Sequence, residues 1–157
     1  METMKNLISV VVTSYNHEKY IEQCLRSIFN QTYRNIELII LDDGSTDGSN
    51  QIIQNVLNDS PFETSFESHE NLGVVKNRNM GLGLTKGDYL LFVDSDNYLD
   101  MDYIEQLYSK LIETNADIAY CDLFNPEKEE FYLKSREFDL TAFLNASFID
   151  NCSLIRR

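Results

Sequence analysis

The sequence predicts an α/β fold, in which helices cover both faces of a mostly parallel sheet. Three observations predict it. Segments rich in β-branched residues alternate along the chain with segments of helical periodicity. The strand candidates 7–13, 36–42 and 88–94 are almost continuously apolar, as parallel strands buried on both faces are. Polar turn residues follow each of these strands directly.

Composition limits the classes of protein to consider. The chain has 157 residues, 43% of them hydrophobic, which suits one domain with its own core. The 26 acidic and 13 basic residues give a net charge of −13, so we expect no nucleic-acid partner. No apolar run approaches the ~20 residues of a membrane-spanning helix. Three widely spaced cysteines indicate reduced thiols, and we expect a cytoplasmic protein.

The first half of the chain shows strands and helices in alternation. After strand 7–13, apolar residues at helical spacing predict a helix within 18–31. Strand 36–42 leads into loop 43–49, where Ser45, Thr46 or Asp47 can cap a helix over 50–58. A weaker strand over 64–67 follows. The glycine-rich segment 71–87 then predicts a helix before strand 88–94.

The second half continues this order with weaker patterns. Asp100 is the expected cap of a helix within 101–115, and 116–124 is the next strand candidate. The charged segment 127–135 is predicted to form one arm of an exposed hairpin. The last segment, 138–157, predicts a short helix followed by a strand.

Three polar segments should meet at one edge of this sheet. The segments 13–16, 42–45 and 94–97 all follow strand ends. Ligands of parallel α/β sheets bind outside the carboxyl ends of the strands, where the strand order reverses. We therefore expect the three segments to open on one crevice.

Two carboxylates lie one residue apart in YLLFVDSDNYLD, at Asp94 and Asp96. Like charges so close repel each other, and Mg²⁺ or Mn²⁺ would offset that repulsion. The spacing alone is weak evidence, since 13 aspartates produce about one such pair by chance. A second pair, Asp100 and Asp102, lies where a helix begins and is explained by capping. A solvated loop with a helix cap is the alternative for Asp94 and Asp96.

Longer motifs carry a family resemblance. The runs ISVVVTSYNHEKYIEQCLRSIFNQTYRNIELIILDDGSTDGS (8–49) and NLGVVKNRNMGLGLTKGDYLLFVDSDNYLD (71–100) resemble the family 2 glycosyltransferases, with Ile8 at a usual valine. The resemblance covers about the first two thirds of the chain. It implies a GT-A fold and, over residues 1–157, a single nucleotide-sugar-binding domain without the acceptor part of its family. It also implies transfer of a sugar from a nucleotide donor, with Mn²⁺ or Mg²⁺ as cofactor.

By position, the resemblance assigns nucleotide-binding roles to Thr13, Tyr15, Asp43, Arg78 and Asp94, and a metal-ligand role to Asp96. Tyr15 would stack on the base, and Asp43 would accept a hydrogen bond from the imide of the base. Asp94 would face the ribose or the donor sugar, and Arg78 would lie near the phosphates. The residues alone leave alternatives open: Tyr15 packing on the first helix, an aspartate that only braces its loop, and a solvated helix face for Arg78.

The expected reaction is an inverting transfer from a UDP-sugar to a saccharide or lipid-linked acceptor, as in bacterial surface-polysaccharide synthesis. Such a transfer needs a general base, which members of the family carry beyond the strand that NCSLIRR resembles. Asp150 is a poor substitute, so the catalytic base remains unassigned. The alternative is a nucleotide-sugar-binding module without turnover. We expect any membrane association to be peripheral, through a partner or a further segment.

Overall fold

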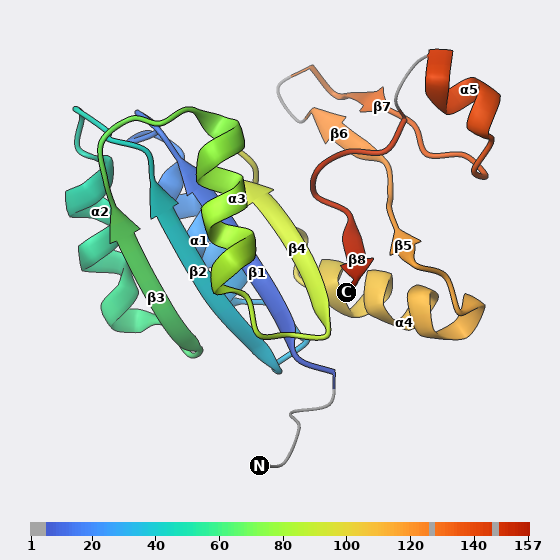
Figure 1. The fold of residues 1–157 in the computed structure, drawn as a ribbon, viewed down its shortest axis with the longest axis horizontal. Coiled ribbons are helices and arrows are strands. Elements are labelled where there is room, and N and C mark those ends of the chain that lie inside the picture. Colours follow the sequence, from blue (N-terminus) through green and yellow to red (C-terminus); the bar gives the residue numbers. More distant parts are fainter. Residues whose placement is uncertain (1–5, 126–127, 146–147) are drawn as a thin grey trace.

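A computed structural model describes residues 6–125, 128–145 and 148–157. It contains a six-stranded sheet in the order β3-β2-β1-β4-β8-β5 and a two-stranded sheet of β6 and β7 (Figure 1). The strands are β1 (Ile8–Ser14), β2 (Ile36–Asp42), β3 (Glu63–Ser68), β4 (Tyr89–Asp94), β5 (Ile118–Ala119), β6 (Leu123–Asn125), β7 (Glu130–Leu133) and β8 (Leu154–Arg156). The helices are α1 (Ile21–Phe29), α2 (Ser49–Val56), the 3₁₀ turn η1 (Leu57–Asp59), α3 (Val74–Leu84), α4 (Tyr103–Thr114) and α5 (Leu140–Asn145).

The sheet is mostly parallel, as the sequence predicts. β1 pairs in parallel with β2 on one side and with β4 on the other, and β2 pairs in parallel with β3. β8 runs antiparallel between β4 and β5. Because β2 follows β1 on one side while β4 lies on the other, the strand order reverses at β1. This reversal is where ligands of such sheets bind.

Helices cover both faces of the sheet. In β1, Val10 and Val12 belong to the larger core, together with buried residues of α1, α2 and α4. Val11 points to the opposite face, where α3 lies (Figure 1). Successive side chains of a strand point to opposite faces, so a strand covered on both faces is apolar over most of its length. All seven residues of β1 and all seven of β2 are buried.

The glycine-rich segment forms α3, as predicted, and Gly81 explains its close fit to the sheet. A Cβ atom at Gly81 would lie 2.5 Å from Cγ1 of Val11 and 3.2 Å from Cδ1 of Leu41. Only glycine lets the helix approach β1 and β2 this closely. The packing also fixes the position of Arg78, one turn earlier on the same helix.

Two expectations in the second half are corrected. Asp100 does not cap α4 with its side chain, and neither does Asp102, which occupies the N-cap position. Instead, Oε1 of Gln31 accepts from the backbone N–H of Ile104. The predicted strand 116–124 is two strands, because the chain leaves the main sheet after Ala119 and pairs with β7 from Leu123 onward.

The remaining predictions for this half are confirmed. β6 and β7 form the exposed hairpin, although Pro126 and Glu127 lie outside the described residues. α5 and β8 are the short helix and the last strand.

Cys24, Cys121 and Cys152 are free thiols, as the sequence predicts. Among the described residues, no helix combines the length and the apolar character needed to cross a membrane.

Candidate active site

The ends of β1, β2 and β4 meet at one edge of the sheet. Ser14 pairs with Asp42, and Thr13 pairs with Asp94. The backbone N–H of Asp43 donates to Ser14 O (2.8 Å), and that of Ser95 donates to Thr13 O (3.2 Å). The segments after these strands are therefore adjacent, as the sequence predicts. This edge lies at the top of the sheet in Figure 1.

The loops after β1 and β2 are joined by side chains of both. Oδ1 of Asn16 accepts from the backbone N–H of Thr46 (2.8 Å), and Ser45 Oγ accepts from that of Asn16 (2.8 Å). Asn16 has a φ of +54°, a conformation that asparagine adopts more readily than most residues. The side chain of Tyr15 remains exposed beside these contacts (46%). Its ring is therefore available to a planar ligand group.

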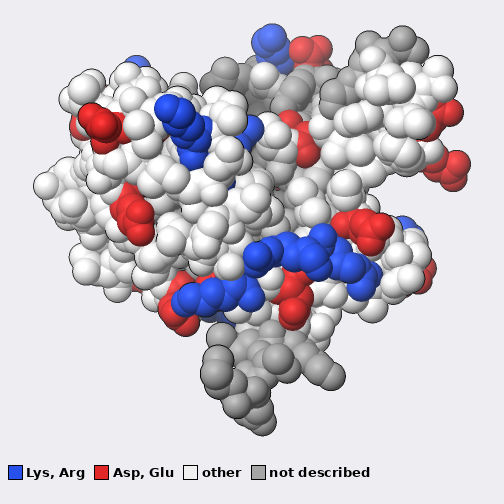
Figure 2. Space-filling model, viewed as in Figure 1, with Lys and Arg blue, Asp and Glu red and all other residues white. Residues whose placement is uncertain are grey.

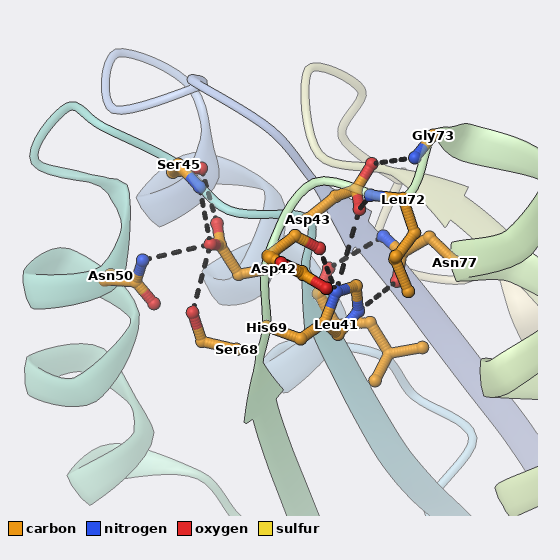
Figure 3. Close-up of polar contacts among 11 residues, drawn as sticks. Leu41, Asp42, Asp43, Ser45, Asn50, Ser68, His69, Leu72, Gly73 and Asn77 are labelled. Carbon is orange, nitrogen blue, oxygen red and sulfur yellow. Dashed lines mark hydrogen bonds and ion pairs between the residues drawn. The ribbon is translucent and has the colours of Figure 1, made fainter.

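Asp42 braces the loop. It is fully buried, and its carboxylate accepts from the backbone N–H of Ser45 (2.9 Å), Nδ2 of Asn50 (2.9 Å) and Oγ of Ser68 (3.3 Å) (Figure 3). These contacts join the end of β2 to α2 and β3. Asp42 thus has the structural role that the sequence left open for one of the two aspartates.

Asp43 points the other way, toward the segment before α3 (Figure 3). Its Oδ1 accepts from the backbone N–H of Leu72 (2.7 Å), and its Oδ2 accepts from that of Gly73 (3.0 Å). Each oxygen keeps a further acceptor site, because an ionised carboxylate has about four lone-pair positions. Gly44 is required here: its φ is +77°, and a Cβ atom would lie 2.7 Å from the backbone nitrogen of Asn71.

Arg78 of α3 lies against the end of β4. Its Nη2 lies 2.5 Å from Oδ1 of Asp94, and the two side chains are 25% and 31% exposed. With the Asn151 amide oxygen turned toward α3, it accepts from Nη1 (3.3 Å) and Nη2 (3.2 Å) of Arg78. Arg78 is therefore held by partners on two other segments, and the solvated helix face is excluded.

Ser95 separates the two carboxylates of the motif by turning inward. It is fully buried, and its Oγ lies 2.6 Å from Nδ1 of His17. Asp96 is exposed beside it. The pKa of the Cys24 thiol is raised by burial first, and then by the charges of Cys152, Asp96 and Asp94.

The carboxylates suit a hard cation that takes most of its ligands from elsewhere. Within the described ranges, no group of three or more His, Cys, Asp or Glu side chains could hold a metal ion. Mg²⁺ and Mn²⁺ accept one or two protein carboxylates and complete their coordination with phosphate oxygens and water. The exposed carboxylate of Asp96 is compatible with this mode of binding.

The visible face of the molecule offers no broad basic surface at this edge. Figure 2 shows most Lys and Arg side chains of this face along the lower edge, with a smaller group over the upper part of α3. Lys86 lies at the opposite end from the site, where it pairs with Glu63 (3.2 Å). An anionic ligand would therefore be held by local groups such as Arg78.

A family model, described as glycosyl transferase family 2, matches residues 9–154. The chain belongs to this family. Among curated relatives, "Glycosyltransferase GlyA" of Streptococcus pneumoniae is 36% identical over 148 residues, covering 92% of this chain and 21% of GlyA. This family 2 domain thus spans only a small part of that relative.

Solved structures agree on the fold. Residues 1–349 of TarS of S. aureus, in complex with UDP-GlcNAc, match with a TM-score of 0.74 and 26% identity, over 96% of this chain and 45% of that solved chain. The mannosyltransferase PcManGT of Pyrobaculum calidifontis, in complex with GDP-Man and Mn²⁺, matches with a TM-score of 0.76 and 20% identity. The match covers 98% of this chain and 45% of the PcManGT chain. The fold of this family 2 glycosyltransferase domain is therefore GT-A.

The structure also brings in residues to which the sequence assigned nothing. His69 lies beside Asp43, Asn77 lies beside His69, Asn151 contacts Arg78, and His17 contacts Ser95. His69 and Asn151 contact predicted site residues across a long separation in the chain. Asn77 acts on Asp43 only through His69, and His17 binds Ser95, the residue between the two carboxylates. One local signal existed for Asn77, a polar residue next to Arg78 in a segment predicted to pack on the sheet.

Proposed function

We propose that this family 2 domain binds a UDP-sugar with Mn²⁺ or Mg²⁺ and transfers the sugar, with inversion, to a saccharide or lipid-linked acceptor. The observation that carries the proposal is a convergence at the edge where the strand order reverses: the exposed ring of Tyr15, the buried carboxylate of Asp43, the Arg78–Asp94 pair and exposed Asp96. The complex of TarS with UDP-GlcNAc supports the choice of donor.

Each side chain has a role in this proposal. Tyr15 stacks on the base, Thr13 lines the nucleoside site at the end of β1, and Asp43 accepts from the base imide with an oxygen that already accepts one amide. Asp94, oriented by Arg78, faces the ribose or the donor sugar. Arg78 also lies near the phosphates, where its charge favours an anionic ligand.

Asp96 is the residue that would hold the cation. A divalent cation bound there supplies Lewis-acid stabilisation of the negative charge that develops on the departing diphosphate. Asp96 and Asp94 keep this corner electronegative, and Ser95 fixes the spacing between them through its buried contact with His17. Arg78 offsets the charge of Asp94 and thereby lowers the repulsion between the two neighbouring carboxylates.

Transfer requires that the acceptor hydroxyl attack the anomeric carbon as the bond to the phosphate oxygen breaks, and that a base take its proton. Asp150 accepts from the backbone N–H of Cys152 through Oδ1 (2.9 Å), and no residue is assigned as the base. A second candidate function is therefore donor binding without turnover. It is favoured by the fact that every role assigned above binds or orients the donor.

Two measurements test the proposal. Calorimetric titration with UDP-GlcNAc and with GDP-mannose, each with and without Mn²⁺, should give metal-dependent binding that favours the UDP-sugar. A UDP-release assay with saccharide and lipid-linked acceptors should then detect turnover. Binding without UDP release would favour the second candidate, and absence of binding to either donor would contradict both.

A further inference from the structure

The imidazole of His69 lies between the end of β2 and α3, and both of its nitrogens face oxygen atoms. Nδ1 is 2.8 Å from the carbonyl oxygen of Glu70 and 3.7 Å from Oδ1 of Asp43. Nε2 is 3.1 Å from Oδ1 of Asn77 (Figure 3). The side chain of His69 is 17% exposed. A carbonyl and a carboxylate can only accept, so Nδ1 carries a hydrogen.

Whether Nε2 also carries a hydrogen depends on the orientation of the Asn77 amide. This side chain is buried, and its Nδ2 donates to the carbonyl oxygen of Leu41 (3.3 Å). Turning the amide over would place two oxygens together at Leu41, so Oδ1 is the atom that faces His69. Nε2 must therefore also donate. An imidazole that donates from both nitrogens is protonated and carries a positive charge.

The surroundings favour that charge. The pKa of His69 is raised above its ordinary value, first by the hydrogen bond to the Glu70 carbonyl and then by the contact with Asn77. The charged groups that act on the ring are Asp43 and Asp42, both at the end of β2, and each raises the pKa further. Burial alone acts in the opposite direction.

His69 also secures the segment that leads into α3. Its backbone N–H donates to Asp42 O (3.2 Å), while the next residues supply the two amides that bind Asp43. The carboxylate of Asp43 is thus held by Leu72, Gly73 and a cationic ring. With a neutral ring, the bare Nε2 would face Oδ1 of Asn77, lone pair against lone pair, and this arrangement would loosen.

We propose that protonated His69 is a positioning residue for the donor base, because it holds the Asp43 carboxylate where an imide N–H can donate to it. The role rests on the proposed function, in which Asp43 reads the base. Uracil has a hydrogen on N3 and neutral cytosine has none, so a well-placed Asp43 favours UDP over CDP. When His69 loses its proton, the competent arrangement is less populated and this preference weakens.

The ratio of UDP affinity to CDP affinity isolates this effect. Both nucleotides carry the same diphosphate, so its titration cancels, and damage that merely loosens the site weakens both. In the wild-type protein with Mn²⁺, the ratio should fall as the pH is raised from about 6 to about 8.5. In His69→Gln the ratio should be about tenfold lower at the acidic end and independent of pH. Lys76→Gln, which removes an exposed cation from α3, is the control and should leave the wild-type profile unchanged.

The charge of His69 is measured separately, on the wild-type protein, by NMR of the ring nitrogens. Only His17 and His69 contribute signals. Both nitrogens of His69 should remain protonated at pH values where a free imidazole is neutral. This role alone would be overturned if one ring nitrogen of His69 carried no hydrogen at a pH below the ordinary pKa of imidazole. It would also be overturned if His69→Gln kept the wild-type affinity ratio and its pH dependence. Failure of both nucleotides to bind the wild-type protein would overturn the proposed function, and this role with it.

Discussion

Nη2 of Arg78 lies 2.5 Å from Oδ1 of Asp94 and thereby joins α3 to the end of β4. This contact explains how two carboxylates can lie one residue apart at the end of a buried strand. One of them is paired with a guanidinium in a partly buried setting, and the other, Asp96, is left to solvent or to a cation. The pair also places a positive charge beside the proposed diphosphate site.

Arg78→Met should weaken the binding of UDP-GlcNAc by roughly tenfold or more, because hydrogen bonds to charged groups contribute about 1.5–3 kcal/mol each. Lys76→Met removes a cation from the same helix at an exposed position and is the matched control. Calorimetric titration of both variants checks the prediction. Equal losses in the two variants would mean that only the overall charge of α3 matters.

The strands of the parallel core could be predicted from the sequence because they are buried on both faces. The predicted strand 36–42 coincides with β2, and β1 differs from its prediction by one residue at each end. The direction of β8 could not be predicted, because a strand paired for only three residues carries no local signal of its orientation. The cap of α4 was missed for a related reason, since Gln31 lies 73 residues from the amide that it binds.

Gly81→Ala should destabilise the domain by about 1–3 kcal/mol, because the new methyl group would overlap Val11 in the core. Gly83→Ala is the matched control: a Cβ atom there meets nothing within 4 Å, so alanine should stabilise the helix by about 0.5–1 kcal/mol. Urea denaturation gives both values. A Gly81→Ala variant as stable as the wild type would show that α3 does not depend on this close approach.

Glu37→Ala should cost about 2–4 kcal/mol in the free energy of unfolding. Its buried Oε1 accepts from Ser9 Oγ (2.5 Å) and from the backbone N–H groups of Lys86 (2.6 Å) and Gly87 (3.1 Å). Ser9 and Lys86 would lose this acceptor, and Gly87 would keep only its contact with Ser9 Oγ (2.9 Å). Glu63→Ala, an exposed partner of Lys86, should cost less than about 1 kcal/mol. Thermal or urea unfolding compares the two, and similar costs would contradict this account of the buried cluster.

The candidate site was only partly predictable. Strand ends located Asp43, Asp94 and Asp96 at one edge, because parallel strands present their carboxyl ends together. The sequence did not decide which of Asp42 and Asp43 braces the loop, since both share the same local context. Contacts with Asn50 and Ser68 decide it for Asp42. Partners such as His69 depend on tertiary packing, which a single sequence does not display.

The contribution of His69 to stability should fall as the pH rises. Its pKa is raised in the folded state, so the stabilisation is fully present below the unfolded value of about 6.5 and is lost as the pH rises through the folded pKa. The difference in unfolding free energy between the wild type and His69→Gln, measured without ligand, should therefore shrink above about pH 6.5. A difference that grows with pH would contradict the assignment of charge to the folded ring.

The central claim is that Asp96 holds a divalent cation that binds the donor diphosphate. The most direct test is the effect of Mn²⁺ on UDP-GlcNAc affinity in the wild type, in Asp96→Ala and in Asp100→Ala, the last being an exposed aspartate of the second Asp-x-Asp pair. We expect Mn²⁺ to raise the affinity of the wild type and of Asp100→Ala by about tenfold or more, or at least 1.4 kcal/mol, and to have no effect on Asp96→Ala. An Asp96→Ala variant that responds to Mn²⁺ as the wild type does would contradict the claim.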